Sequence, residues 1–420
     1  MRLFTTHQLL KRVSKNCEVN LFILRIVIVA DDKKKEGGNN EIIKHLRKAL
    51  LDQATMLLSL TSSPSSAISR KQNEGKSLQV DVEYIVSKEY LPPYLPQNLK
   101  ELFRPFYLRN ISQDTTTFLT ADLIITTQPN SHCIKHKNHI IYFQHHLKQY
   151  YDLFWSSLRQ KKGIRKKAVF LILAALARIS DKLYLTPNLR NSHVVVNSET
   201  VGERLKKYNK YPNFYIISPG CNIPSEAKGK DYRQQPNTIR NGDDFRPLLL
   251  SFSRLDVMQK GINIIVQTAF NLPQYHFVIA GPYDPSIDSI KSSTRITPNV
   301  NIMVGKFAEE QKAELYSSCN LFLAPYLEED FGITPLEANA YGKPVIYCMD
   351  GGEIVRTQKH KQTGFMCRRT PSSIAEGIEY CLKNKESMAQ ACIENAKQYS
   401  WNNFERLIVQ YIIGSLVTKR

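Results

Sequence analysis

Short apolar runs alternate with helical stretches along most of this chain, and the runs fall into two separate series. Short continuous apolar runs are typical of strands that are buried on both faces, and their alternation with helices predicts parallel sheets. The strand candidates of the first series are Leu24–Ala30, Leu78–Val86, Asp122–Thr127, His139–Phe143, His193–Asn197 and Phe214–Ile217. Among them, Leu78–Val86 alternates apolar and polar residues, whereas the others are continuous. Those of the second series are Leu248–Phe252, His276–Gly281, Asn301–Val304, Leu321–Pro325, Val345–Tyr347 and Gly364–Cys367.

A polar stretch at residues 223–246 separates the two series and is rich in Lys, Arg, Gln, Asn, Gly and Asp. Such a composition is typical of a linker between domains. We therefore expect an α/β protein with a first Rossmann-like domain at residues 1–222 and a second at residues 247–398. Residues 399–420 are expected to form a closing helix. A chain of 420 residues is long enough for two separate cores.

The chain is strongly basic, with 57 Lys and Arg against 38 Asp and Glu and a net charge of +19. Such a charge attracts anions in general, including nucleotides, nucleic acids and anionic lipid headgroups. The 8 cysteines are scattered and form no CxxC pair, which favours a reducing compartment and argues against a zinc site. The apolar run at residues 168–177 is too short to cross a bilayer, so we expect a soluble or peripheral protein.

The segment from Glu329 to Val345 places two carboxylates, Glu329 and Glu337, on either side of a Phe-Gly turn that follows an apolar run. In parallel α/β sheets, ligands bind at the carboxyl ends of strands, facing helix N-termini. Ionised carboxylates accept hydrogen bonds from sugar hydroxyls, so the pair suits a polyhydroxyl ligand. A structural alternative stays open, because the string Thr334 to Glu337 also reads as a capping box with Thr at the N-cap.

Two cations, Arg254 and Lys260, follow the first strand of the second series. Arg offers a planar fork of donors and Lys a mobile point charge, and both bind phosphate. The pair therefore indicates a pyrophosphate site at the carboxyl end of that strand. The alternative is an ordinary solvated loop.

In the first half, Gly37 and Gly38 follow the first strand and precede a helical stretch, after three consecutive lysines. A Gly pair suits either a plain turn or a loop that approaches a ligand closely. The fourth strand candidate runs into a pair of histidines, His145 and His146. Adjacent side chains on a strand point to opposite faces, which argues against a metal site built from this pair.

Together these motifs carry a family resemblance. The string from Glu329 to Val345 resembles the carboxylate signature of the retaining family-4 glycosyltransferases (glycosyl transferases group 1). Arg254 and Lys260 resemble the diphosphate clamp of that family, and the resemblance is densest over residues 247–367. It implies the GT-B architecture, in which two Rossmann-like domains with parallel sheets face each other across a cleft. It also implies transfer of a sugar from a nucleoside diphosphate donor, with retention of configuration and with no metal ion or other cofactor.

The resemblance also implies roles for individual residues. Arg254 and Lys260 would stabilise negative charge on the leaving nucleoside diphosphate, as a metal ion does in other transferases. Glu329 would bind the hydroxyls of the transferred sugar, and Glu337 would accept hydrogen bonds from the ribose. The backbone N–H groups of Phe331, Gly332 and Ile333 would help to bind the sugar, and Thr334 would lie near the phosphate.

In the first half, the resemblance places Gly37 and Gly38 over the donor phosphate, and a histidine against the sugar across the cleft. We favour His145 for that contact, with His146 as the alternative because the register at a strand end is uncertain by one residue.

The resemblance makes mannose from GDP-mannose the first expectation for the donor, with a lipid-linked or other glycan as the acceptor. A UDP-linked hexose or N-acetylhexosamine is the alternative. An alternative function of another class is that of a non-catalytic nucleotide- or nucleic-acid-binding protein on a GT-B scaffold. The presence of Arg254, Lys260, Glu329 and Glu337 argues against it, since a decayed site would have lost some of them.

Six cations lie between Arg159 and Lys167, directly before the apolar run, and no acidic residue lies between Asp152 and Asp181. This pattern is typical of a segment at an anionic membrane surface. A solvated helix end and a nucleic-acid patch are the alternatives, but the cations are not interleaved with the aromatics that stack on bases. We therefore expect a cytoplasmic protein that is peripheral at the inner face of a membrane and binds no nucleic acid.

Overall fold

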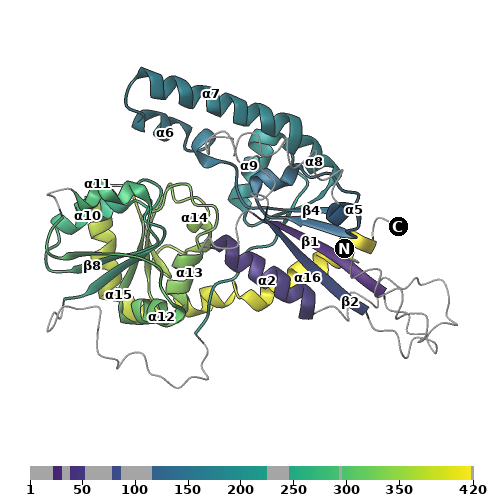
Figure 1. The fold of residues 1–420 in the computed structure, drawn as a ribbon. Helices are drawn as coiled ribbons and strands as arrows, with labels where there is room; N and C mark the ends of the chain where they lie inside the picture. The colour runs from purple at the N-terminus through teal and green to yellow at the C-terminus, as the bar shows by residue number, and fades with distance from the viewer. Residues whose placement is uncertain are drawn as a thin grey trace, which may run out of the picture.

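The computed structural model describes residues 22–30, 38–52, 78–86, 116–224, 246–292 and 296–417. They form two α/β units, each built on one sheet of six parallel strands (Figure 1). No helix among these residues is long and apolar enough to cross a membrane.

The first sheet has the strand order β2-β1-β3-β4-β5-β6. Its strands are β1 (Phe22–Ala30), β2 (Leu78–Val86), β3 (Leu123–Thr126), β4 (His139–Phe143), β5 (His193–Val196) and β6 (Tyr215–Ile216). The helices of this unit are α2 (Gly38–Asp52), α5 (Thr116–Leu119), α6 (Phe154–Gln160), α7 (Ile164–Ser180), α8 (Thr186–Asn191) and α9 (Glu199–Asn209). The central strands are fully buried, as continuous apolar runs predict.

The last helix, α16 (Trp401–Val417), packs against the first unit although it follows the second unit in the chain. It contacts α2, and the ring of Trp401 stacks on that of His45 at a centroid distance of 4.0 Å. Phe404 and Ile412 of α16 are buried in one apolar cluster with Ile26 of β1. The chain therefore crosses back, and its C-terminal helix completes the core of the first unit.

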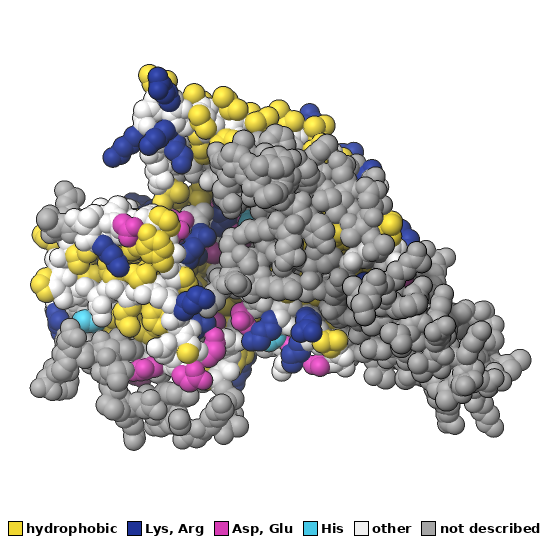
Figure 2. All heavy atoms as spheres, in the orientation of Figure 1, with side chains coloured by type: hydrophobic (Ala, Val, Ile, Leu, Met, Phe, Trp, Pro, Cys, Tyr) yellow, Lys and Arg dark blue, Asp and Glu magenta, His cyan; other side chains and the backbone are white. Residues whose placement is uncertain are grey.

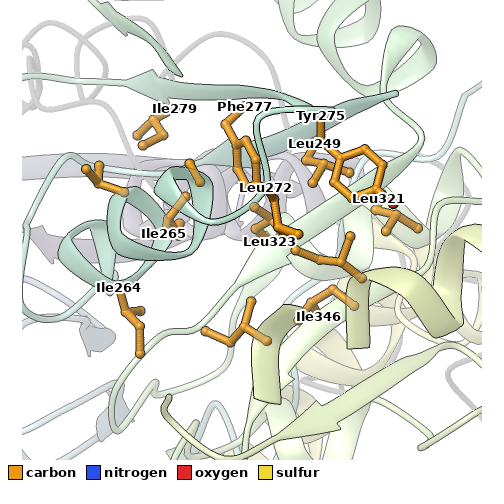
Figure 3. Packing of buried hydrophobic residues seen from close by; sticks show 14 of the residues in the cluster. Leu249, Ile264, Ile265, Leu272, Tyr275, Phe277, Ile279, Leu321, Leu323 and Ile346 are labelled. Atoms are coloured by element: carbon orange, nitrogen blue, oxygen red, sulfur yellow. The ribbon is translucent and has the colours of Figure 1, made fainter. Parts of the chain in front are cut away.

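The second sheet has the order β12-β11-β10-β7-β8-β9. Its strands are β7 (Leu248–Phe252), β8 (His276–Gly281), β9 (Val300–Val304), β10 (Leu321–Ala324), β11 (Val345–Cys348) and β12 (Gly364–Cys367). The helices are α10 (Ile262–Phe270), α11 (Asp288–Lys291), α12 (Glu309–Ser318), α13 (Ile333–Ala340), α14 (Ile354–Thr357) and α15 (Pro371–Lys397). Leu249, Phe277 and Leu323 from three strands pack against Ile265 of α10 on one face of this sheet (Figure 3).

All twelve strand predictions are confirmed, and their bounds shift by at most two residues. The side chains of β2 and most of the predicted linker, residues 225–245, lie outside the described residues. The proposed division into domains at residues 222 and 247 therefore stays a proposal.

The capping-box alternative at Thr334 is wrong for helix α13. The helix begins at Ile333, its N-cap is Gly332 with a left-handed φ of 85°, and no side chain caps it. Its end is a Schellman motif, in which the N–H of Lys343 bonds to the carbonyl of Ala338 at 3.0 Å and that of Gly342 to Asn339 at 2.8 Å. Glu337 is thus free of the capping role that the sequence allowed.

Candidate functional site

The loop between β10 and α13 carries Glu329, and neighbouring loops hold its backbone. The N–H of Leu327 bonds to the carbonyl of Gln259 at 2.8 Å, and the N–H of Glu353 bonds to the carbonyl of Glu329 at 3.0 Å. Arg369 donates to the carbonyls of Pro325 and Tyr326, both at 2.7 Å. The position of Glu329 is therefore fixed from three sides.

Arg369 also binds a residue that follows β11, the strand next to β10. Its guanidinium forms a bidentate ion pair with Asp350, at 2.7 and 2.8 Å, just after β11. A bidentate pair fixes direction as well as distance. Arg369 thus joins the carboxyl ends of β10 and β11.

Lys260 and Glu329 form an ion pair of 2.7 Å, and their side chains are only 14% and 16% exposed. The Lys260 ammonium also lies over the ring of Tyr326, 4.2 Å from its centroid. Burial lowers the pKa of Lys260, while Glu329 opposes that effect. Burial alone would raise the pKa of Glu329, but Lys260, Lys148 and Arg254 together lower it to about 2.

Arg254 lies at the rim of this pair. Its side chain is 55% exposed, and its guanidinium donates to Gln259 at 3.1 Å. Its ion pairs with Asp256 and Asp284 are long, at 3.5 and 3.9 Å. The two predicted cations therefore differ: Lys260 is buried against Glu329, whereas Arg254 is held loosely and can turn towards a ligand.

Glu337 lies on α13 and accepts a hydrogen bond of 2.7 Å from the hydroxyl of Tyr316 on α12. Burial raises the pKa of Glu337, against the effects of Tyr316 and Lys312. Thr334 lies one turn earlier, with its hydroxyl 3.1 Å from that of Tyr326, the residue under Lys260. Tyr326 thus connects the Lys260 end of the site to the first turn of α13.

The turn into α13 requires glycine at position 332. The φ of Gly332 is +85°, and a Cβ at this position would lie 2.8 Å from the side chain of Ile354. Phe331 is buried and packs edge-on against Tyr399. Because the helix begins at Ile333, the N–H groups of its first turn have no partner inside the helix. Backbone donors there suit an anionic ligand.

The structure separates the two histidines. His146 is 2% exposed, its ring Nε2–H donates a hydrogen bond of 2.7 Å to the Asn209 side-chain oxygen, and it packs among Phe143, Tyr151 and Tyr208. Burial lowers the pKa of His146 to about 4, which keeps it neutral. His146 is therefore a core residue. His145 is only partly buried, with its Nδ1 2.8 Å from the carbonyl of His146.

The predicted glycine loop is only partly described. Gly38 is the first residue of α2, while Gly37 and the lysines before it lie outside the described residues. The expectation that both glycines lie over a donor phosphate stays a prediction.

Sequence reasoning missed Arg204 and Lys148, two cations of the first unit that bind the residues on either side of Glu329. Arg204 is 6% exposed and pairs with Asp330 at 2.5 Å, Glu328 at 2.9 Å and Asp152 at 2.9 Å. Lys148 pairs with Asp330 at 2.8 Å and donates to the carbonyl of Glu328 at 2.9 Å. The loops after β4 and β10 are thus joined.

The sequence held one indication of such cations, the acidic triplet at residues 328–330, but only Glu329 of this triplet was assigned a role. The partners lie more than a hundred residues away, so no local spacing predicts them.

A second set of bonds joins the two units at helix α9. Glu353 accepts a bond of 2.9 Å from the N–H of Thr200 in the first turn of α9, and Arg356 donates to the Thr200 hydroxyl at 2.8 Å. Arg356 also pairs with Glu203 at 2.9 Å. The loop at residues 351–353 is therefore held against the first unit, next to the loop of Glu329.

The second half of the chain is similar in sequence to a known family. Residues 237–399 match the family model described as glycosyl transferases group 1. The match covers most of the second unit and includes Arg254, Lys260, Glu329 and Glu337.

Curated relatives are glycosyltransferases by name. The sulfoquinovosyl transferase SQD2 of Arabidopsis thaliana is 22% identical over 247 residues, which are 56% of this chain and 45% of that protein. The alpha-1,3/1,6-mannosyltransferase ALG2 of Homo sapiens is 27% identical over 229 residues, 49% of this chain and 52% of that protein. The chain thus spans about half the length of the curated relatives it matches.

Solved structures share the whole fold. Sucrose-phosphate synthase from Thermosynechococcus elongatus has a TM-score of 0.67 at 18% identity and covers 92% of this chain and 98% of its own. Anabaena HepE, solved in complex with UDP-glucose, has a TM-score of 0.61 at 15% identity and covers 93% of this chain and 99% of its own. The expected GT-B architecture is confirmed as the fold.

Proposed function

We propose that the protein transfers a hexose from a nucleoside diphosphate sugar to a glycan or lipid-linked acceptor, with retention of anomeric configuration. The observation that carries the proposal is the Lys260–Glu329 pair, 2.7 Å apart at the carboxyl end of β10 and next to the start of α13. It combines a cation for a leaving phosphate with an ionised acceptor for sugar hydroxyls.

In this proposal, Lys260 and Arg254 stabilise the charge that develops on the diphosphate as the bond to the sugar breaks. The loose hold on Arg254 fits that role, since a 55% exposed guanidinium can reorient without breaking a short ion pair. Glu329, with a pKa of about 2, is fully ionised at neutral pH and orients the sugar. Glu337 binds the ribose, and His145 contacts the sugar from the first unit.

The transfer we propose uses one face of the sugar. The bond from the anomeric carbon to the phosphate oxygen breaks, a bond to the acceptor oxygen forms on the same face, and the acceptor proton passes to the departing phosphate oxygen. No protein nucleophile is needed for this step, because the phosphate itself is the base.

We propose GDP-mannose as the donor, and the similarity to the mannosyltransferase ALG2 supports it. The fold it shares with HepE, solved with UDP-glucose, keeps a UDP-linked sugar as the alternative. A thermal-shift panel of nucleotide sugars separates the two, since a ligand that binds the native state raises the melting temperature. A shift with GDP-mannose alone supports the first, and a shift with UDP-glucose or UDP-N-acetylglucosamine alone supports the second.

We also propose that the reaction needs no metal ion, because in this proposal Lys260 and Arg254 supply the positive charge beside the leaving phosphate. Activity is then expected to persist in EDTA. Strong stimulation by added Mn²⁺ or Mg²⁺ would contradict this part of the proposal.

A non-catalytic nucleotide-binding protein is the competing function. Both functions predict nucleotide binding, so the discriminating measurement is release of nucleoside diphosphate from the donor over time. Binding without release would favour the competing function.

A further inference from the structure

Helix α7 carries an exposed apolar face. One side of the helix is buried through Phe170, Ala174 and Ala177. The opposite side, called the outer face here, exposes large apolar side chains: Val169 52%, Leu171 45%, Ile172 59%, Leu176 42% and Ile179 53%. More than half of the exposed large hydrophobic residues in the described part of the chain lie between residues 155 and 183.

Cations gather next to the outer face. Lys162, Arg165, Lys166 and Lys167 are exposed at the start of α7, and Arg159 is exposed on α6. No acidic side chain lies between Asp152 and Asp181 to neutralise them. In Figure 2, apolar side chains line the upper edge of the molecule where Figure 1 places α7, and Lys and Arg side chains project near the end of that edge.

The segment from α6 to α7 adjoins the candidate site. At the end of α6, the side-chain amide of Gln160 donates to the sulfur of Met258 at 2.9 Å. Met258 lies in the loop that carries Arg254 and Lys260. Lys148, just before α6, binds the loop of Glu329. A surface that bound α7 would therefore lie close to the site.

The length of α7 decides how it can meet a bilayer. At about 1.5 Å per residue, its 17 residues extend over about 25 Å. The helix is packed along its length by Phe170, Ala174 and Ala177, so only its outer face is available. A helix with an apolar face and flanking cations lies in the plane of the interface, with the face in the acyl boundary and the cations at the headgroups.

We propose that the outer face of α7, together with the cations at residues 159–167, is the docking surface for an anionic lipid bilayer. Charge complementarity selects this partner: apolar side chains alone would suit a second protein, but the cations beside them, which form no ion pair with the described residues, suit anionic headgroups. The inference rests on the proposed function only where it places a lipid-linked acceptor next to the site.

The experiment is co-sedimentation of the full chain with vesicles of phosphatidylcholine, with and without phosphatidylglycerol. We expect binding to the anionic vesicles only, and release at about 1 M salt, where the Debye length falls to about 3 Å. Two variants test the two halves of the surface. Ile172→Gln, Leu176→Gln and Ile179→Gln together remove the apolar face, and Lys162, Arg165, Lys166 and Lys167 changed to Gln remove the cations.

Matched controls carry the same changes elsewhere. Leu51, Leu119 and Phe270, which are also exposed, are changed to Gln to match the apolar variant. Lys359, Arg368, Lys383 and Lys397, exposed on the second unit, are changed to Gln to match the loss of four charges. We expect each test variant to lose at least about tenfold in vesicle partitioning, as several headgroup contacts of roughly 1 kcal/mol each imply. The controls should bind like the parent protein, and circular dichroism checks that all variants are folded.

Failure to bind anionic vesicles, equal binding to neutral vesicles, or unchanged binding in both test variants would each overturn the proposal. Self-association that the apolar variant abolishes, without vesicle binding, would assign the face to a second copy of the chain. Binding of RNA without binding of vesicles would assign the cations to nucleic acid. No nucleotide sugar is present in the assay, so a wrong donor or a wrong reaction leaves its outcome unaffected.

Discussion

Glu329 and Glu337 are both partly buried, yet their surroundings act on them in opposite directions. Lys260, Lys148 and Arg254 lower the pKa of Glu329 to about 2, despite burial. At Glu337, burial outweighs the hydrogen bond from Tyr316 and raises the pKa. The cations around Glu329 thus outweigh its burial, while the partners of Glu337 do not outweigh its burial. A ligand that donates hydrogen bonds would therefore stabilise the ionised form of Glu337 more than that of Glu329.

Substitutions of Glu337 and Glu329 are therefore expected to affect different steps, nucleotide binding and sugar transfer respectively. Glu337→Gln should weaken binding of the free nucleoside diphosphate by about 1.5–3 kcal/mol, the usual range for a hydrogen bond to a charged group, and should not lower the melting temperature. Glu329→Gln should spare that binding and lower transfer. Calorimetry with the nucleoside diphosphate measures the first effect. Equal weakening in both variants would show that the two roles are wrong.

The stability contributed by ionised Glu329 should depend on pH in a defined window. Its pKa is lower in the folded protein, about 2, than its ordinary value of 4.5. The contribution is therefore fully present above about pH 4.5 and is lost as the pH falls from 4.5 towards 2. Urea unfolding of the parent protein and of Glu329→Gln, compared between pH 7 and pH 3, checks this. A stability difference that stays constant over that range would contradict the assigned ion pair.

At the scale of elements, the start and the end of α13 both use glycine, but under different constraints. Gly332 at the start has a φ of +85° and no room for a Cβ beside Ile354, whereas a Cβ on Gly342 at the end would only touch Ala389 at 3.4 Å. The start also carries the backbone donors of the site. Adding a Cβ at the start of α13 should therefore affect activity as well as stability, whereas adding one at the end should affect stability alone.

We expect Gly332→Ala to lower both stability and activity, because the backbone around Glu329 and Ile333 must shift to relieve the contact. The control, Gly342→Ala, should cost roughly 1–2 kcal/mol for a residue forced into the left-handed region but leave turnover of the folded protein unchanged. Thermal unfolding and a transfer assay on both variants provide the comparison. Equal losses of activity would mean that the start of α13 has no special role.

Two arginines that join the units differ in burial. Arg204 is 6% exposed and holds Asp152, Glu328 and Asp330, whereas Arg356 is 40% exposed. Breaking a buried ion pair leaves uncompensated charge and is strongly destabilising, but an exposed pair contributes little. The loop of Glu329 therefore depends on Arg204 from the opposite unit.

Arg204→Gln should destabilise the protein by about 3–5 kcal/mol, and it should lower turnover by releasing residues 328–330. Arg356→Gln, its exposed counterpart, should cost at most about 1 kcal/mol. Urea unfolding gives both values, and hydrogen exchange of the loop reports its release. Unchanged exchange in Arg204→Gln would show that Arg204 only stabilises the interface and does not position Glu329.

At the scale of the whole molecule, the sequence predicted the two sheets because continuous apolar runs mark buried parallel strands wherever they occur. It also predicted that Glu329 and Lys260 would each follow the carboxyl end of a strand. It did not predict Arg204 or Lys148, because ion pairs between distant segments leave no periodic signal. Nor did it resolve which histidine is buried, because both follow the end of β4 at Phe143, where strand alternation no longer decides which side chain points inward.

The central claim is that the Lys260–Glu329 site breaks the bond between a sugar and a nucleoside diphosphate. The most direct test follows the release of nucleoside diphosphate from GDP-mannose and UDP-glucose in the presence of EDTA, with the parent protein and with Lys260→Ala. We predict release from one donor by the parent protein, and a rate lower by about 10²–10³ in the variant, the usual cost of losing a group that stabilises developing charge. Equal rates in the two proteins would contradict the claim.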